Sequence, residues 1–324
     1  MSVDVVSTPV PTTARPFTAT RRRTRRGMTL RRQVGLQLLC LAITATVLFP
    51  ILWIVSMALD PRNIARPEGL NLIPPGASLA AFAKVIAQPT LNPVGFPQLA
   101  LNSIIIAVIV SVASVSIGIL AAYAFSRMQF RGREFFMIAV LAVLMLPAVA
   151  TIAPLFVLLN RIQIGPFDLA WLHIAKFNLR ASLLGVALAV TSGQLPFAIW
   201  NMKGYLDTIP RDLEEAAAVD GAGRVQTFLH VILPLSTPVL AVTAFFGFIA
   251  GWTEFYFSWM FLAGNVQSWT LAMTLNGMVG QYAGNTPWSQ FAAYAILVAL
   301  PVSVVYLFLQ RYIISGLTIG GVKG

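Results

Sequence analysis

The chain has 324 residues, of which 57% are hydrophobic and only 10% are charged. A soluble domain does not need this much apolar sequence, whereas about 20 apolar helical residues cross the core of a bilayer. The composition therefore excludes an ordinary soluble protein. It indicates several membrane-spanning helices, because a helix satisfies its own backbone hydrogen bonds in lipid.

The net charge of +11 does not indicate nucleic acid binding. Eight of the 22 Lys and Arg residues lie between Arg15 and Arg32, directly before the first apolar segment. Basic residues at that place hold topology and contact anionic lipid, so we expect membrane lipid as a partner and no nucleic acid. Residues 1–33, rich in Thr, Pro, Ser and Arg, are predicted to form a disordered cytoplasmic tail.

Residue types that bind metals or perform catalysis are scarce. Cys40 is the single cysteine, and His173 and His230 lie far apart, outside any zinc-ligand spacing. No lysine is followed by Ser or Thr, so a Gly-x4-Gly-Lys-Ser/Thr nucleotide-binding loop is absent. We expect no catalytic residues, no metal and no cofactor on this chain.

Six apolar segments are long enough to span a bilayer as helices, and they cover residues 34–59, 99–125, 135–159, 181–205, 236–262 and 290–312. The proline-rich stretch between the first two is predicted to contain a short helix at 79–86. Pro147 and Pro154 predict two kinks in the third span. The sequence from Gly193 to Pro196 is expected to interrupt the fourth span.

The distribution of Lys and Arg tests the orientation of these spans. With the N-terminus inside, sixteen Lys and Arg residues lie in internal segments and six in external ones. The external loops are then 60–98, 161–180 and 264–288. By the positive-inside rule, both termini and the segment 207–234 are cytoplasmic.

The segment 207–234 is the one long polar, helix-prone interruption between apolar segments. Pro210 suits a first helical turn, and acidic residues follow it at the positive end of the helix dipole. Asp220 and Gly221 tolerate a left-handed backbone, so the helix should stop there before a second begins near Arg224. The pattern predicts two short helices at an angle.

The spacing Glu215-Ala216-Ala217, three residues, Gly221, nine residues, Val231, one residue, Leu233-Pro234 resembles the EAA loop of ATP-binding-cassette importer permeases. Tyr123-Ala-Phe-Ser-Arg127 and the string from Gly316 to Gly324 are similar to the smaller permease subunit of maltose-type sugar importers. The resemblance covers residues 34–324. An ordinary alanine-rich cytoplasmic hairpin is the other interpretation of 207–234.

The resemblance implies an all-α polytopic membrane protein with six transmembrane helices and the fold of a type I importer permease. It implies residence in the cell membrane of a prokaryote and uptake of sugar, maltose or maltodextrin or a related oligosaccharide, by alternating access. The implied partners are a second permease subunit, two ATPase subunits that bind ATP and Mg, and an extracytoplasmic sugar-binding protein. Another solute such as glycerol phosphate, or a secondary transporter without ATPase, is the alternative.

The resemblance also assigns three sets of site residues. The first is the ATPase-coupling loop, with Glu214, Glu215, Ala216, Ala217, Asp220 and Gly221. The second is the last external loop, 264–288, which in the family reaches the binding protein and helps displace sugar; its candidates here are Gln281, Tyr282, Gly284 and Asn285. The third is the tail 315–324, with Gly320, Gly321 and Lys323, whose equivalent runs between the ATPase subunits. A plain surface loop and a frayed terminus are the alternatives for the last two.

Glu254 is an acidic residue within an otherwise uncharged predicted span. Ionisable groups at membrane depth usually face a protein interior or a water-filled path, so Glu254 is a candidate for the translocation path. It also lies about 27 Å along its helix, near the outer end, where it can reach the interface. Both interpretations stay open from sequence.

Overall fold

The computed structural model describes residues 29–64, 72–164, 167–169, 172–174, 177–279 and 286–320. Within these ranges the side chains are described for all residues except 164–177 and 313–320. The chain divides after Pro50 into two units, which are described separately. The predicted external-loop residues Gln281, Tyr282, Gly284 and Asn285 lie outside the described residues, as do Gly321 and Lys323 of the tail.

Helix α1 (Leu30–Leu59) begins within the predicted tail, four residues before the expected first span. Its part in the first unit is exposed along its whole length, although from Leu38 onward its only polar side chains are Thr44 and Thr46. A helix that is apolar on all sides is stable in a lipid environment rather than in water. The helix continues through Pro50, and the rest of it belongs to the second unit.

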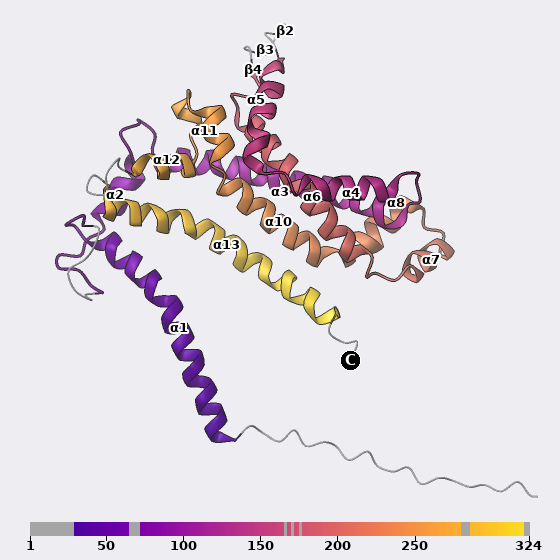
Figure 1. The fold of residues 1–324 in the computed structure, drawn as a ribbon, viewed down its shortest axis with the longest axis horizontal. Coiled ribbons are helices and arrows are strands. Elements are labelled where there is room, and N and C mark those ends of the chain that lie inside the picture. The colour runs from indigo at the N-terminus through magenta and orange to yellow at the C-terminus, as the bar shows by residue number, and fades with distance from the viewer. Residues whose placement is uncertain are drawn as a thin grey trace, which may run out of the picture. The chain divides into compact units, whose positions relative to one another are not determined.

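The second unit is almost entirely helical (Figure 1). After α1 its helices are α2 (Ala80–Ala87), α3 (Phe96–Arg127), α4 (Arg133–Val143), η1 (Ala148–Thr151), α5 (Ile152–Arg161), α6 (Leu183–Leu206), α7 (Asp212–Val219), α8 (Arg224–Thr227), η2 (Phe228–Ile232), α9 (Leu233–Leu235), α10 (Thr237–Trp252), α11 (Tyr256–Leu262), η3 (Val266–Ser268), α12 (Leu271–Met278) and α13 (Trp288–Gly320).

Two short strand pairs lie in the predicted external loop 161–180. Strand β1 (Gln163–Ile164) pairs antiparallel with β4 (Phe177–Asn178), and β2 (Phe167–Leu169) pairs antiparallel with β3 (Leu172–Ile174). These strands are too short to have a sequence pattern of their own. The described chain is therefore all-helical apart from this local ribbon.

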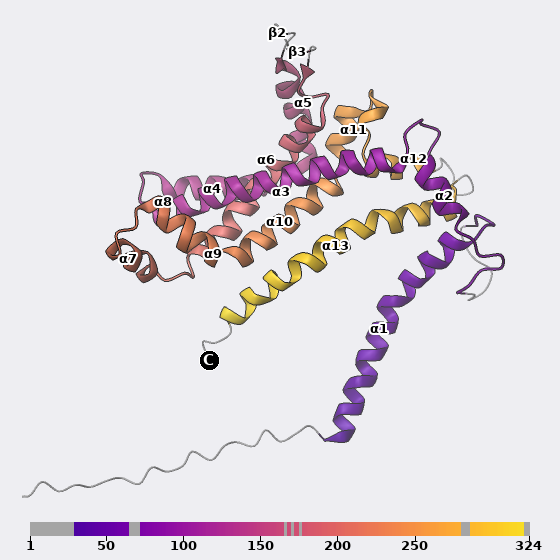
Figure 2. The same cartoon turned by 180° about the vertical axis from the view of Figure 1, so that it is seen from behind.

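Helices α3, α6 and α10 form the centre of the second unit and lie side by side in both ribbon views (Figures 1 and 2). Two glycines let α10 approach α3 closely. A Cβ atom on Gly251 would lie 2.6 Å from Cα of Ala107, and one on Gly247 would lie 3.0 Å from Cα of Ser111. Small residues four apart are a common device for close helix packing in membranes.

The third predicted span is broken once rather than kinked twice. Helix α4 ends at Val143, and α5 follows η1 at an angle of 101° to α4. Pro147 lies at the break and caps η1, as expected. Pro154 lies in the first turn of α5, where a missing N–H removes no helical hydrogen bond, so the second expected kink is absent.

Two other span predictions need correction. Helix α6 is continuous through Pro196, so the expected interruption at Gly193–Pro196 does not occur. The fifth predicted span, 236–262, is not one helix, because α10 ends at Trp252 and α11 begins at Tyr256. The break coincides with Glu254, whose contacts are described below.

The predicted loop 264–288 and the predicted tail are also partly helical. The segment before α12 is tied to α3, because Asn102 Nδ2 donates to the backbone oxygens of Gln267 at 2.8 Å and Trp269 at 2.9 Å. The amide of Leu271, the first residue of α12, donates to Ser103 Oγ of α3 at 2.9 Å. Helix α13 extends to Gly320, so residues 315–320 continue the helix rather than forming a tail. The short helix expected at 79–86 is confirmed as α2.

Four helices of the described chain are long and apolar enough to cross a membrane: α1, α3, α6 and α13 up to Tyr312. Two bent pairs also pass when each is taken together, Arg133–Val143 with Ala148–Arg161, and Arg224–Leu235 with Thr237–Trp252. The described residues thus supply four candidate spans, or up to six if each bent pair is one span.

Candidate functional site

The polar segment between α6 and α10 forms the two predicted short helices. Helix α7 ends at Val219, and Gly221 follows with φ of +83°, the left-handed conformation that glycine adopts without strain. The amide of Ala222 donates to Ala217 O at 2.9 Å, and that of Gly221 donates to Ala218 O at 3.1 Å. This hydrogen-bond pair ends the helix and turns the chain toward α8.

The return path to α10 contains a π-helical turn, η2. Ile232 of this turn is fully buried against Ile119, Met202 and Leu206 of α3 and α6. The chain then bends by 74° before α10 begins. Pro234 and Pro238 flank the bend, and each lacks the N–H that a continuous helix would use.

The loop is held to the end of α3 by an ion pair. Arg127 Nε lies 2.5 Å from Glu214 Oε1, and the two side chains are only 8% and 18% exposed. Arg127 also donates through Nη2 to Ile209 O at 2.8 Å. Tyr123, one turn earlier on α3, donates a long hydrogen bond of 3.4 Å to the other oxygen of Glu214.

A second contact fixes the entry of the loop. Ser126 Oγ donates to Asp207 Oδ1 at 2.7 Å, and Lys203 forms an ion pair with Oδ2 of the same carboxylate. Burial alone would raise the pKa of Asp207, but the hydrogen bonds from Lys203 and Ser126 outweigh it and lower the pKa below its usual value. The carboxylate therefore stays charged where α6 ends.

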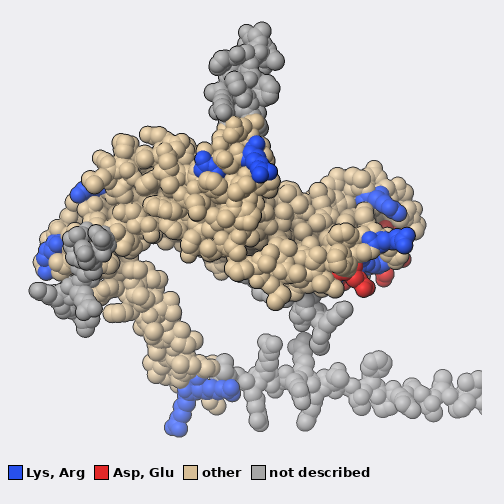
Figure 3. All heavy atoms as spheres, turned by 45° about the horizontal axis from the view of Figure 1, so that its top comes forward, with Lys and Arg blue, Asp and Glu red and all other residues tan. Residues whose placement is uncertain are grey.

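The opposite face of the loop is exposed. Glu215, Ala216, Asp220 and Gly221 are all open to the surroundings, while Ala217 is half-buried. Apolar side chains lie among them, with Val219 87% exposed and those of Leu213, Val225 and Leu229 exposed by 43% or more. Figure 3 shows acidic side chains gathered at this end of the second unit, next to basic ones.

Of the predicted coupling residues, Glu214 thus behaves differently from the others. It points inward and holds the loop, whereas Glu215, Ala216, Asp220 and Gly221 form part of the exposed face. The partners of Glu214 belong to the Tyr123–Arg127 string, to which the sequence pattern assigns no role. Two sequence signals could have pointed to this ion pair. They are an arginine at the end of a span and a glutamate in the first turn of a polar helix.

Glu254 lies between α10 and α11 and caps the second of these helices. Its Oε1 accepts from the amide of Phe257 at 2.8 Å, and its Oε2 accepts from the amide of Ser258 at 2.8 Å and from Ser258 Oγ at 2.7 Å. These bonds satisfy free N–H groups of the first turn of α11. The place of Glu254 on a translocation path remains a prediction.

The described residues contain no group of three or more His, Cys, Asp or Glu side chains placed to hold a metal ion. The inner face of the loop is held to α3, and its outer face is exposed. This arrangement suits the docking of another protein rather than catalysis.

The family is given by sequence comparison. The profile of the family described as "Binding-protein-dependent transport system inner membrane component" matches residues 114–319. The chain belongs to this family and is a membrane-embedded component of a transport system. The family is defined by transport and not by catalysis.

The relatives narrow this class. The maltose/maltodextrin transport system permease protein MalG of Yersinia pestis is 37% identical over 302 residues, which are 90% of this chain and 94% of that protein. The trehalose/maltose transport system permease protein MalG of Thermococcus litoralis is 36% identical over 279 residues, 86% of this chain and 92% of that protein. Both are named as permease proteins of sugar transport systems, which is the kind of protein that the sequence resembles.

Solved structures share the fold. A bacterial ABC transporter involved in the import of the acidic polysaccharide alginate matches with a TM-score of 0.68 and 22% identity, covering 88% of this chain and 98% of that chain. The MetNI methionine ABC transporter matches with a TM-score of 0.50 and 17% identity, covering 67% of this chain and 93% of that chain.

Proposed function

We propose that the chain is one permease subunit of an ATP-driven, binding-protein-dependent importer for maltose, maltodextrin or a related oligosaccharide. The loop 207–234 is its ATPase-coupling loop. The observation that carries this proposal is the loop's two-sided character: an inner face tied to α3 by Arg127 and Glu214, and an outer face with exposed Val219, Leu213 and Ala216. An exposed apolar patch rimmed by charges is typical of a protein docking site.

Six spans are the proposed topology, with α4–α5 counted as one bent span and α10 as the membrane-crossing part of the bent pair Arg224–Leu235 with Thr237–Trp252, whose first part belongs to the loop. The excess of Lys and Arg on the side of the loop supports a cytoplasmic position for it and for both termini. The docked ATPase would move α7, and the ties to α3 would carry that movement into the spans. The spans would then move as rigid bodies, which is the motion that alternating access requires.

Two ATPase subunits need two coupling loops, and this chain has one. A second permease subunit is therefore part of the proposed complex, with a binding protein on the outer face. The sugar is proposed from the names of the relatives at 36–37% identity. Another oligosaccharide or glycerol phosphate is the alternative solute.

Co-purification of the tagged chain in mild detergent tests the coupling role. The double variant Gly221→Asp with Glu215→Lys alters the outer face of the loop and leaves Glu214 in place. We expect it to lose the ATPase subunits and to keep the partner permease. Gly264→Asp, at an exposed turn where an added Cβ meets no atom within 4 Å, is the control and should keep both. A wild-type chain that retains no ATPase would contradict the proposal.

Uptake into proteoliposomes tests the driving force and the solute. The assembled complex with its binding protein should accumulate labelled maltose only when ATP is enclosed with the ATPase subunits. Glycerol phosphate should not compete. Uptake driven by an ion gradient without ATP would instead support a secondary transporter.

A further inference from the structure

A hollow of about 860 Å³ lies beside the end of α3, and no residue of α7 is part of its lining. It is formed by the last turn of α3, the turn that follows, the start of α4 and one side chain from α6. Neither the coupling role nor the family assignment uses this hollow. It lies at the end of two candidate spans, α3 and α6, which is the depth at which lipid headgroups meet a membrane protein.

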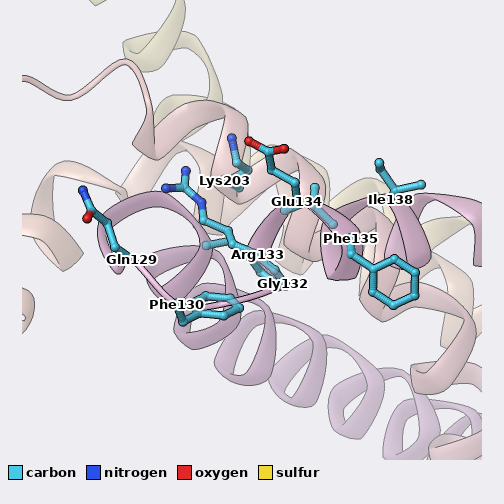
Figure 4. A pocket seen from close by; sticks show the side chains of 10 residues that line it. Gln129, Phe130, Gly132, Arg133, Glu134, Phe135, Ile138 and Lys203 are labelled. Atoms are coloured by element: carbon cyan, nitrogen blue, oxygen red, sulfur yellow. The ribbon is translucent and has the colours of Figure 1, made fainter.

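The lining of the hollow has a polar and an apolar part. Figure 4 shows the charged ends of Arg133, Glu134 and Lys203 on one side and the rings of Phe130 and Phe135 on the other. Phe135 is 71% exposed and Ile138 65% exposed, so the apolar part opens outward along α4. Such a lining suits a molecule with a polar head and a hydrocarbon chain.

The charges around the hollow leave one positive charge for a ligand. Lys203 is paired with Asp207, whereas Arg133, which lies in the lining with Glu134, forms no ion pair with a carboxylate of the described residues. Arg131, which is outside the lining and exposed in the turn that leads into α4, adds one further positive charge near the hollow. The surplus matches the single negative charge of a phosphodiester.

We propose that this hollow binds an anionic glycerophospholipid of the phosphatidylglycerol class. The phosphodiester contacts Arg133, whose planar guanidinium suits phosphate oxygens, with Lys203 as a second cation. Gln129 and Glu134 accept hydrogen bonds from the glycerol hydroxyls of the headgroup. One acyl chain lies along Phe135 and Ile138.

Each part of the lining has a role in this arrangement. A free phosphate ion would leave the exposed wall of Phe135 and Ile138 in contact with water. A partner protein seated on the hollow would have to bury Arg133 and Glu134 with new partners, which is strongly unfavourable when pairing is incomplete. A phospholipid satisfies both parts and keeps the charged groups near the aqueous boundary.

Native mass spectrometry of the full chain, purified with its co-purifying subunits, tests the proposal. Dioleoyl phosphatidylglycerol and dioleoyl phosphatidylethanolamine are added in equal amounts, and bound lipid is counted. The two lipids share acyl chains and a phosphate but differ in net charge. We expect wild type to bind phosphatidylglycerol about fivefold more tightly than phosphatidylethanolamine, as one uncompensated cation near a surface provides.

Arg133→Gln should remove that preference, and Arg133→Lys should keep most of it. Arg161→Gln makes the same change in charge on an exposed residue outside the hollow and outside the loop 207–234, and is the matched control. Equal binding of the two lipids by wild type, or an unchanged preference in Arg133→Gln, overturns the proposal. Loss of the partner permease from Arg133→Gln also overturns it, because the hollow would then be a protein interface. Retention of the ATPase is scored separately, so a failure here is distinct from a failure of the coupling role.

Discussion

Arg127 at the end of α3 and Glu214 in the first turn of α7 form an ion pair that is largely shielded from solvent. The pair joins a membrane-span candidate to the loop with which the chain is proposed to contact its ATPase. Removal of one partner would leave the other charge buried, and such losses cost on the order of 3 kcal/mol.

Reversal of the two charges tests whether Arg127 and Glu214 hold the loop. Arg127→Glu should lower the melting temperature of the purified complex and reduce transport, because two carboxylates then face each other. The double variant Arg127→Glu with Glu214→Arg should recover a substantial part of both. Glu215→Arg, on the exposed face, is the control and should not rescue Arg127→Glu. If the double variant is no better than the single one, the pair does not hold the loop.

The left-handed turn after α7 makes a second prediction. Gly221 has φ of +83°, and no atom lies within 4 Å of a Cβ added there. Gly221→Ala should therefore destabilise the loop by about 1 kcal/mol through backbone strain alone. Gly221→Asn should be milder, since asparagine tolerates this conformation. Gly223→Ala is the matched control, because Gly223 has φ of −71° and an added Cβ lies 3.8 Å from the nearest atom, Gln226 Oε1.

The contact of α10 with α3 predicts opposite effects for two helical glycines. Gly251→Ala should lower the melting temperature, because its Cβ would lie 2.6 Å from Cα of Ala107 and the helices must separate. Gly193→Ala in α6 has open space and should raise stability by about 0.5–1 kcal/mol through helix propensity. Thermal unfolding in detergent measures both. Equal effects would contradict close packing at Gly251.

Glu254 makes a prediction that separates its two roles. Glu254→Gln retains one acceptor oxygen and loses the bidentate cap, so the stability of α11 should fall by about 1 kcal/mol. Ser258→Ala removes one of its bonds and leaves the charge in place. If both variants unfold more easily but only Glu254→Gln slows uptake, the carboxylate has a role on the path beyond capping. Normal uptake in Glu254→Gln at permissive temperature leaves the cap as its sole role.

The buried carboxylate after α1 makes a prediction about pH. Hydrogen bonds from Arg62 lower the pKa of Asp60 below its usual value, although burial acts in the opposite direction. A carboxyl group with a lowered folded pKa contributes stability above its unfolded pKa of about 3.9, and loses it as the pH falls through the folded pKa. Wild type should therefore be more stable than Asp60→Asn at pH 7. The difference in melting temperature should shrink below about pH 4, and a difference that grows on acidification would contradict this assignment.

The local signals in the sequence predicted much of the fold. Runs of apolar residues located α1, α3 and α6 within a few residues, because a bilayer-length helix needs little tertiary context. The acidic first turn of α7 and the glycine at 221 predicted a helix and its end, since both effects act within one or two turns. These parts of the candidate site follow from local sequence alone.

Long-range contacts were not predictable in this way. Nothing near Glu214 in sequence shows that Arg127 faces it, so its inward position was not predicted. The break at Glu254 was not predicted either, because apolar sequence continues on both sides and the cap depends on a side-chain conformation. Residues 271–278 were expected to be loop, yet Leu271 and Met273 are fully buried against other helices. The apolar residues of this segment have helical spacing, but the segment is too short for that pattern to outweigh the neighbouring polar residues in the prediction.

The π-helical turn at Phe228–Ile232 sets the direction in which the loop faces. A π turn holds one more residue than the α-helical turn it replaces, and each residue rotates a helix by about 100°. Deletion of His230 would turn this segment into an α-helical turn and leave the chain on both sides in nearly the same rotational register, whereas a deletion in the neighbouring α-helical residues would rotate the loop about the helix axis by about 100°. After the second kind of deletion, Arg127 and Glu214 would no longer meet. The outward direction of Val219 and Glu215 thus depends on residue count as well as residue type, and the π turn is the place in this segment where the loss of one residue changes that direction least.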